Sequence, residues 1–504
     1  MNTTTLPAAG DVLTPLAPLE AVRRPVQARR SVLIGGLLLG ALSAWTFDGG
    51  ALGLGFFLVT LAFSVLLGTA NRKEGWQSAR AHKWLLVAAV LLASFAVIRD
   101  SGMLLFFDVI GVTGLLALAA RGWNGDLPVA DVSMKALTAS PFVAVGQGVK
   151  TGASAISSEL HRSKLSESWP KLFAPLAKMT LIGGPIIGVV TLLLASGDAA
   201  FEAQLDGALT HLVGLPVPQV VRMAMVAAWT FTMTVGLVTW ALRRRSLSRG
   251  EEAVAPKVQL GLPEAFAILG GLTLVLVLFS LVSARCAFAP DSCTLPAGVT
   301  YSKYAREGFW QLLAVAGIVL MTVLSVPHRA KIETATQGLA VKLGASVLVA
   351  ATLPMLLSAV NRMMLYEDVY GFTRQRVLSQ VICVFVALLL VWRAVTVWAW
   401  PQRFALGFVA AGVLVLTGFN VMNPDAFIAR KNIAREGHLD TWYLRELSAD
   451  AAGVLRQIPA ERLDQYDRTY FATYRSAPEN VSSFNLARAC DRAGGAPLHS
   501  VLCP

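Results

Sequence analysis

The run from Ser358 to Arg376 gathers charged and aromatic side chains between two long apolar segments. Polar groups this close to segments of bilayer-spanning length are costly unless they are paired or have a task. The members with functional side chains are Arg362, Tyr366, Glu367, Asp368, Tyr370, Arg374 and Arg376. This run is therefore the leading candidate for a functional site.

The arginines of this run could bind an anionic lipid headgroup or a sugar, because a guanidinium presents a planar fork of donors suited to phosphate and carboxylate. Glu367 and Asp368 could act as an acid–base pair or bind a divalent cation. Adjacent residues on a helix point about 100° apart, so these two carboxylates need not converge. The alternative is a salt-bridged connection that clamps the neighbouring helices to the C-terminal tail.

Three residues from other segments could join this cluster. Asp198, Arg306 and Asp425 lie outside or at the ends of apolar segments, on the same predicted side of the chain as the 358–376 run. Asp198 and Asp425 could equally serve as helix-terminal caps. With the seven residues above, they make up the predicted polar cluster.

Asp108 and Arg222 are ionisable residues inside apolar segments. At 1.5 Å per residue, both would lie roughly 8–10 Å below the same membrane boundary. Intramembrane charges are functional candidates, and these two could form an ion pair. The alternative is a structural pair that holds helices in register, or an Arg222 side chain that extends to the membrane surface.

The sequence predicts no metal, nucleotide or cofactor site. The six histidines have no metal-binding spacing, and the five cysteines include no CxxC motif. Nucleophile-elbow, P-loop and dinucleotide-binding fingerprints are absent from the sequence as well. We therefore expect no cofactor, and the sequence leans against an enzyme.

The composition places these residues in a membrane protein. Of the 504 residues, 55% are hydrophobic and 15% are charged, whereas a soluble chain carries about 25% charged residues. Apolar runs of roughly 20 residues cross a bilayer as helices, because their backbone groups must be satisfied internally. We predict an all-α transmembrane bundle of about eleven helices. Its apolar segments are 31–47, 50–70, 84–99, 101–120, 174–196, 217–241, 262–284, 308–325, 337–359, 378–399 and 404–420.

The distribution of Lys and Arg predicts the orientation. With the N-terminus in the cytoplasm, the inside connections carry far more Lys and Arg than the short outside ones, as expected for such proteins. The net charge of +12 then reflects cytoplasmic loops rather than nucleic-acid binding. Two pairs of cysteines, Cys286 with Cys293 and Cys490 with Cys503, fall outside and are candidate disulfides; the alternative is four unpaired thiols.

The predicted organisation has five parts. They are a disordered cytoplasmic head (1–30), four transmembrane helices (31–120), a cytoplasmic connection (121–173), a seven-helix core (174–420) and an extracytoplasmic helical tail (421–504). The spacing from Phe142 to Ser163 fits an amphipathic helix on the membrane surface, or an ordinary loop with a short helix. In the tail, Asn423-Pro424-Asp425 has the residue types of a helix start, and Asp440 and Ser448 predict further helix starts.

Five short runs together resemble a bacterial integral-membrane family that is known as a domain of unknown function. The runs are 195–201, 304–310, 362–376 with its Tyr-Gly-x-Thr-x-x-Arg core, 423–432 with its Asn-Pro-Asp start, and 440–450. Gly197 departs from the pattern, where we expect alanine. The resemblance implies a multi-pass protein of the bacterial inner membrane and supplies no activity.

Three classes of function follow. The first is a cell-envelope component that binds a lipid headgroup, a partner protein or a signal at its outer face, since all five runs fall on that side. The second is a small-molecule or ion transporter, which Asp108 and Arg222 favour. The third is a membrane-embedded transferase for a lipid-linked substrate. The first class best fits the absence of catalytic motifs.

Overall fold

The structure is a computed structural model. It describes residues 28–46, 52–72, 80–124, 134–162, 217–243, 259–288, 301–435, 439–473, 476 and 481–493. The described chain is helical, and its β-type contact is one isolated bridge between Leu260 and Ala330. The predicted all-α class is therefore confirmed.

One group of helices comes from the first half of the chain. It contains α1 (Arg30–Thr46), α2 (Leu54–Arg72), α3 (Arg80–Ile98), α4 (Gly102–Asn124) and α9 (Val217–Leu242). Their apolar side chains share one core, in which Leu67, Leu85, Leu92 and Ala119 are fully buried. The opposite faces expose residues such as Leu38 and Val87, as expected where lipid, rather than water, is the solvent.

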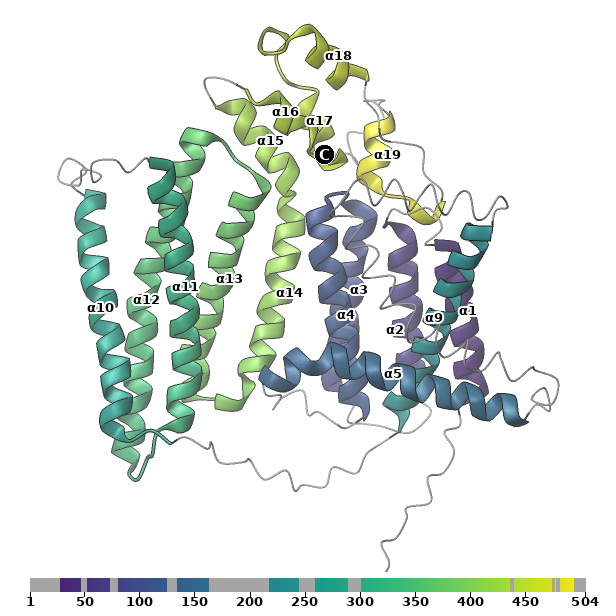
Figure 1. Cartoon of the computed structure of the whole chain (residues 1–504), viewed down its shortest axis with the longest axis horizontal. Helices are drawn as coiled ribbons and strands as arrows, with labels where there is room; N and C mark the ends of the chain where they lie inside the picture. Colours follow the sequence, from purple (N-terminus) through teal and green to yellow (C-terminus); the bar gives the residue numbers. More distant parts are fainter. Residues whose placement is uncertain are drawn as a thin grey trace, which may run out of the picture.

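Helix α5 (Met134–Arg162) runs across one end of this group instead of along it (Figure 1). It packs closely on α9: the backbones approach so closely that a Cβ added to Gly236 of α9 would lie 1.8 Å from the carbonyl oxygen of Gly148 of α5. Arg121 of α4 donates to the Oγ atom of Ser140 at 2.9 Å. The observed helix, Met134–Arg162, is longer than the predicted segment 142–163. Its position on a membrane surface stays a prediction.

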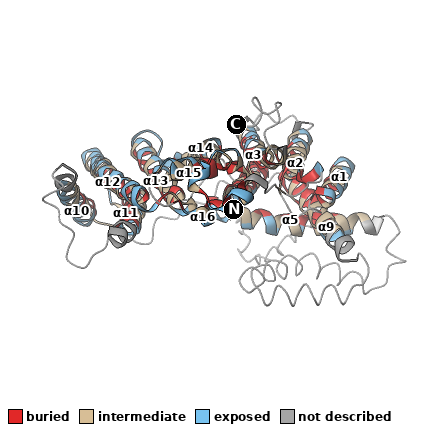
Figure 2. Ribbon diagram, turned by 90° about the horizontal axis from the view of Figure 1, so that it is seen from above, coloured by how far each residue is buried: buried red, intermediate tan, exposed pale blue. Residues whose placement is uncertain are grey.

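A second group is formed by α10 (Leu262–Phe288), α11 (Tyr301–Arg329), α12 (Ala335–Tyr370) and α13 (Arg374–Trp398). They share a separate core that includes Phe309, Leu348 and Met355. Helix α14 (Phe404–Met422), which follows the short η6 turn (Pro401–Arg403), lies between the two groups (Figures 1 and 2).

The chain after α14 folds into short helices beyond one end of the bundle, and residues 423–493 are called the C-terminal cap below (Figure 1). Its elements are α15 (Pro424–Ala434), α16 (Thr441–Arg445), η7 (Ala449–Ala451), α17 (Ala452–Leu455), η8 (Ala460–Arg462), α18 (Gln465–Thr473), η9 (Val481–Ser483) and α19 (Leu486–Ala493). The core of the cap also takes in Leu104 of α4, Val377 of α13 and Phe419 of α14. The cap is therefore docked on both helix groups.

Seven described helices are long and apolar enough to cross a membrane. They are Gly102–Asn124, Met223–Leu242, Leu262–Ser283, Gly308–Arg329, Ala335–Tyr370, Arg374–Trp398 and Pro401–Met422. Shorter apolar helices span Arg30–Thr46, Leu54–Ala70 and His82–Ile98. The chain is thus consistent with a multi-pass membrane protein. The segment predicted at 174–196 lies outside the described residues, so a count of about eleven stays a prediction.

Candidate functional site

The central contact at the capped end joins Arg374, the first residue of α13, to Asp425 in the first turn of α15. Arg374 donates from Nε to Oδ1 at 2.8 Å and from Nη2 to Oδ2 at 2.6 Å. This is the bidentate geometry that guanidinium and carboxylate groups favour. Burial raises the pKa of Asp425. The hydrogen bonds and positive charge of Arg374, together with the hydrogen bonds from Ser448, outweigh this effect and hold the pKa below its usual range.

Ser448 connects Asp425 to a second buried carboxylate, Asp450. The Oδ2 atom of Asp425 accepts from the backbone N–H of Ser448 at 3.0 Å and from its hydroxyl at 2.6 Å. The same hydroxyl lies 3.1 Å from Oδ2 of Asp450. One serine thus lies between two buried carboxylates.

Asp450 fixes the start of α4, which belongs to a distant part of the sequence. Its Oδ2 atom accepts the backbone N–H groups of Asp100 and Ser101, each at 2.8 Å, just before α4 begins at Gly102. A carboxylate in this position satisfies otherwise unpaired N–H groups and interacts favourably with the helix dipole. Burial nevertheless raises the pKa of Asp450 to about 6.

The connection between α3 and α4 is held by further groups at this end. Arg99 donates from Nε to the carbonyl oxygen of Asn420 at 2.8 Å, and its Nη1 atom lies 3.8 Å from Oδ1 of Asp450. Asp100 forms an ion pair with Arg488 of α19. Asn485 donates to the carbonyl oxygens of Ala96 and Arg99, at 2.9 and 2.8 Å, and so caps the C-terminus of α3.

The structure separates Glu367 from Asp368. Glu367 is fully buried and accepts from Nε2 of Gln380 at 2.5 Å, whereas Asp368 is exposed. The two carboxylates therefore do not face one common substrate or metal position. The acid–base or cation pair considered for them has no geometric support in this arrangement.

The arginines of the 358–376 run contact protein groups. Arg376 lies over the ring of Tyr366 at 4.2 Å and donates to the carbonyl oxygen of Tyr370 at 3.1 Å. Tyr366 and Tyr370 have ring centroids 4.8 Å apart. Arg362 lies over the ring of Phe279 at 5.8 Å. These contacts match the alternative of a connection that clamps helices together.

The turn between α12 and α13 is tied to the cap by an amide. Asn432 of α15 accepts the N–H of Phe372 at 2.7 Å and donates to its carbonyl oxygen at 2.9 Å. Gly371 before it has φ +80°, a conformation that favours glycine. The Tyr-Gly-x-Thr-x-x-Arg and Asn-Pro-Asp runs thus meet in space, through Arg374 with Asp425 and Phe372 with Asn432.

The other predicted site residues are not part of this described network. Asp108 is buried in α4 and accepts from Asn420 of α14 at 2.9 Å. Asp198 and the side chains of Arg222 and Arg306 lie outside the described residues, so the predicted pair of Asp108 with Arg222 stays a prediction.

One of the predicted disulfide cysteines is described with its bond. Cys490 on α19 is disulfide-bonded. Its predicted partner Cys503, together with Cys293 and the side chain of Cys286, lies outside the described residues. Both predicted pairings therefore stay predictions.

Sequence reasoning missed the roles of Arg99, Asp100, Asp450 and Asn420. A weak signal existed, because Arg99-Asp100 interrupts two apolar segments and Asp450 ends one of the quoted runs. Asp440 caps α16 as predicted, accepting from the N–H of Tyr443 at 3.0 Å. Ser448 precedes a helical turn as predicted, but its hydroxyl bonds to Asp425 instead of capping that turn.

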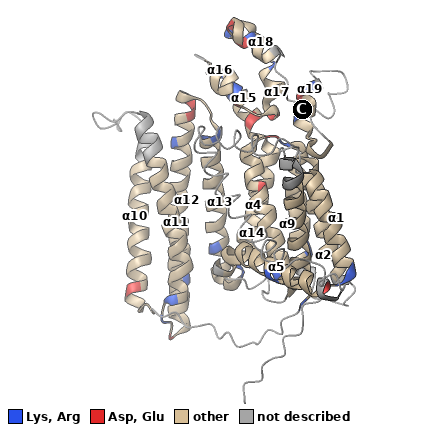
Figure 3. Cartoon of the chain, turned by 45° about the vertical axis from the view of Figure 1, so that its right-hand side comes forward, with Lys and Arg blue, Asp and Glu red and all other residues tan. Residues whose placement is uncertain are grey.

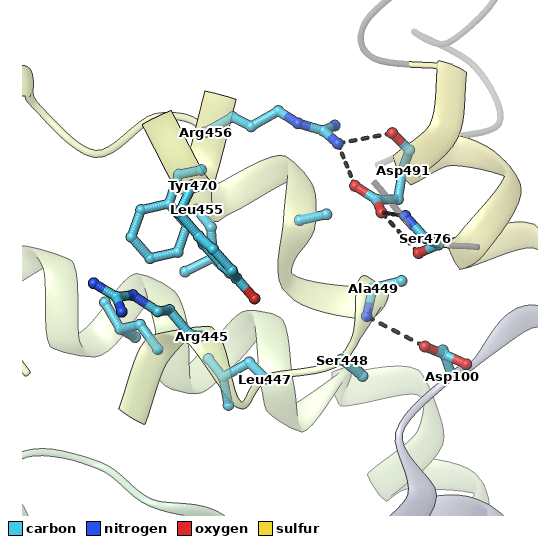
Figure 4. Close-up of a pocket in the computed structure, with 13 residues that line it drawn as sticks. Asp100, Arg445, Leu447, Ser448, Ala449, Leu455, Arg456, Tyr470, Ser476 and Asp491 are labelled. Atoms are coloured by element: carbon cyan, nitrogen blue, oxygen red, sulfur yellow. Dashed lines mark hydrogen bonds and ion pairs between the residues drawn. The ribbon is translucent and has the colours of Figure 1, made fainter. Parts of the chain in front are cut away.

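A small cavity of about 140 Å³ lies beside this network, within the C-terminal cap (Figure 4). Its lining residues come from the α3–α4 connection and from most of the cap, and they include Asp100, Arg445, Ser448, Arg456, Tyr470 and Asp491. Arg456 is paired with Asp491, whose Oδ2 atom also accepts from Ser476 at 2.7 Å. Arg445 is paired with Asp467 and lies over the rings of Tyr466 and Tyr470. The cavity can accommodate a small polar group between fixed donors and acceptors.

Charged residues lie toward the ends of the helices and in the cap, while the middle of the bundle is largely uncharged (Figure 3).

A family model described as a domain of unknown function (DUF4153) matches residues 86–458, which include Arg99, Arg374, Asp425 and Asp450. No curated protein and no solved structure gives a significant match.

We predict that Asp425→Ala lowers the free energy of unfolding by about 3 kcal/mol, because it leaves the largely buried guanidinium of Arg374 without its partner. Thermal unfolding of the purified protein in detergent measures this change. Asp368→Asn is the matched control, since this carboxylate is exposed, and it should change stability by less than about 0.5 kcal/mol. Equal effects of the two substitutions would contradict the central role of the Arg374–Asp425 pair.

The raised pKa of Asp450 predicts a pH dependence of stability. The folded protein binds a proton at Asp450 more tightly than the unfolded chain, so stability falls as pH rises from roughly 4 to 6, by up to about 3 kcal/mol. Asp450→Asn should remove this component while an oxygen stays available to the N–H groups of Asp100 and Ser101. Denaturant unfolding of both proteins across this pH range tests the prediction, and parallel curves would contradict it.

Proposed function

We propose that this chain, which belongs to the DUF4153 family, a domain of unknown function, is a non-catalytic membrane protein of the bacterial envelope that binds a ligand or partner at its capped end. The observation that carries this proposal is the cavity beside the α3–α4 connection, lined by charged groups that are already paired. Paired and buried charges give a fixed recognition surface. They are poorly suited to proton transfer, which needs a group free to change its protonation during each turnover.

The ligand class follows from the walls of the cavity. Arg445 and Arg456 present donors, Asp100 and Asp491 present acceptors, and Tyr470 presents an aromatic face. A small polar group that carries both donors and acceptors, such as part of an envelope sugar or a peptide end, suits this mixture better than a bare phosphate. The exposed Trp442 and Tyr466 on neighbouring helices extend the surface for a larger partner.

We propose that the cap lies outside the cytoplasm, in the bacterial inner membrane. The excess of Lys and Arg in the connections at the opposite end supports this orientation. The disulfide bond of Cys490 in α19 supports it independently, because disulfides persist in oxidising compartments. The bound ligand would then meet the protein from the periplasmic side.

Two other classes receive less support. A transporter is favoured by one observation, the carboxyl group of Asp108 fully buried in α4 at membrane depth. A transferase would need catalytic carboxylates at the capped end, and the divergence of Glu367 and Asp368 argues against that use of the pair. Glu367→Gln and Asp368→Asn should therefore leave an envelope product unchanged.

Filling the cavity tests the proposed binding function. Ala452 lines the cavity, so Ala452→Phe should occupy it and abolish complementation of a deletion strain, at unchanged protein level and thermal stability. Ala460→Phe is the matched control, because Ala460 is exposed in the same part of the cap and does not line the cavity. Full complementation by a stable Ala452→Phe protein would rule out this cavity as the binding site.

Labelling of single cysteines tests the orientation. In a background without the native cysteines, a cysteine at the exposed Gln457 of the cap should react with an impermeant maleimide in intact cells. A cysteine at the exposed Ala139 of α5, at the other end of the bundle, should react after the cells are opened. The reverse pattern would place the cap in the cytoplasm and make an intracellular ligand the better proposal.

A further inference from the structure

Asp108 and Asn420 form a carboxyl–amide contact inside the membrane, at the seam between α4 and α14. Both residues are fully buried, at 0% exposure. Asn420 donates from Nδ2 to Oδ1 of Asp108 at 2.9 Å and to the carbonyl oxygen of Leu416 at 3.0 Å. Because both acceptors face the Nδ2 side, the orientation of the amide is fixed: its nitrogen faces them and its oxygen does not.

One oxygen of each side chain in this contact accepts no hydrogen bond. Oδ2 of Asp108 and Oδ1 of Asn420 are both buried without a hydrogen-bond partner. Both are acceptors if Asp108 is ionised, so neither can satisfy the other. A single proton on Oδ2 would supply the missing donor and give the two-bond pairing of a carboxylic acid with an amide. Among the described side chains, an ionised carboxylate here would instead be a buried charge without a counter-charge, which is far more costly.

None of the described charged side chains on the surrounding elements pairs with Asp108. Helix α14 contains no ionisable residue, and on α3 Arg80, His82 and Lys83 lie at the far end, where His82 packs near Trp123. Arg121 of α4 is also at that end and bonds to Ala136 and Ser140 of α5. Arg72 of α2 ends its helix there too, and the side chain of Arg222 on α9 lies outside the described residues. Arg99, at the near end of α3, bonds to the carbonyl oxygen of Asn420 and is paired with Asp450.

The seam is also too tightly packed for a larger occupant. Gly111 is three residues after Asp108 and so lies on the same side of α4. A Cβ at Gly111 would lie 3.2 Å from Cδ1 of Leu416 on α14 and 2.9 Å from Cδ1 of Leu92 on α3. A proton needs no volume, whereas a metal ion with its ligands does.

We propose that Asp108 is a proton-binding site that is occupied at neutral pH, and that the protonated Oδ2 of Asp108 donates a hydrogen bond to Oδ1 of Asn420. Loss of the proton would set a carboxylate against the amide oxygen of Asn420 and weaken the α4–α14 contact. Proton occupancy is thereby coupled to the seam that joins α14 to the first helix group. This site is separate from the cavity in the cap and stands whether or not the cavity binds a ligand.

Infrared spectroscopy of the full-length protein in nanodiscs, at neutral pH in potassium buffer, tests this site. Wild-type protein should show the carbonyl band of a protonated carboxyl group, displaced in D₂O, and Asp108→Asn should lose that component. Glu367→Gln is the matched control, because it removes another fully buried carboxyl group that is paired with an amide. The Asp108 component should remain in that variant.

A second variant keeps the test decisive if Asp108→Asn does not fold. Asn420→Leu removes the acceptor, so the Asp108 band should persist and move to higher frequency, as for a carboxyl group with fewer hydrogen bonds. Identical spectra of wild type and Asp108→Asn in this region would overturn the proposal. Loss of the wild-type band on adding sodium chloride would also overturn it and would assign the oxygens of Asp108 and Asn420 to a sodium ion instead.

Discussion

The buried carboxylate of Asp425 is the group on which the capped end of the molecule depends. It is fully buried and satisfied by two bonds from Arg374 and two from Ser448. Asp425 on α15 and its two partners, Arg374 on α13 and Ser448 in the turn before η7, belong to three different elements. A charge in this environment is tolerated because every one of these donors is in place, so the elements are held in one relative position.

Ser448 and Asp450 extend this constraint to the first helix group. Asp450 holds the start of α4 through the N–H groups of Asp100 and Ser101, and Asn485 holds the end of α3. The two helix groups have separate apolar cores, and in a membrane apolar surface alone gives little preference for one arrangement of helices over another. The polar cap therefore supplies much of the specificity with which the two groups are joined.

Helix α14 is the second connection between the groups, and it works by different means. Its Phe408 ring lies against Phe385 of α13 at 5.4 Å, while Leu416 and Asn420 face α4. Directly after it, Asn423 takes a left-handed conformation with φ 53° and starts α15 by accepting the N–H of Ala426. Thus an apolar helix of membrane-spanning length passes into the cap within one residue, and the buried polar pair at its end is close to the network of the cap.

The sequence by itself determined the helical class, the membrane character and the position of most helices. Apolar runs of bilayer length must form helices to satisfy their backbone groups, whatever their neighbours. Local helix starts at Asn423 and Asp440 were also predictable, because a capping side chain bonds to backbone groups within three residues. The sequence also showed the density of polar side chains in the 358–376 run, while its role as a functional site stays a prediction.

Tertiary structure alone decided which of these polar groups meet. Arg374 and Asp425 are 51 residues apart, and Asp450 lies 350 residues from Asp100, so no local spacing links them. Glu367 and Asp368 are adjacent in sequence, yet one is buried against Gln380 and the other is exposed. Asp108 was recognised as an intramembrane acid, but its described partner is the uncharged Asn420. Periodicity places a side chain on a face of its helix, whereas its partner is set by how distant helices pack.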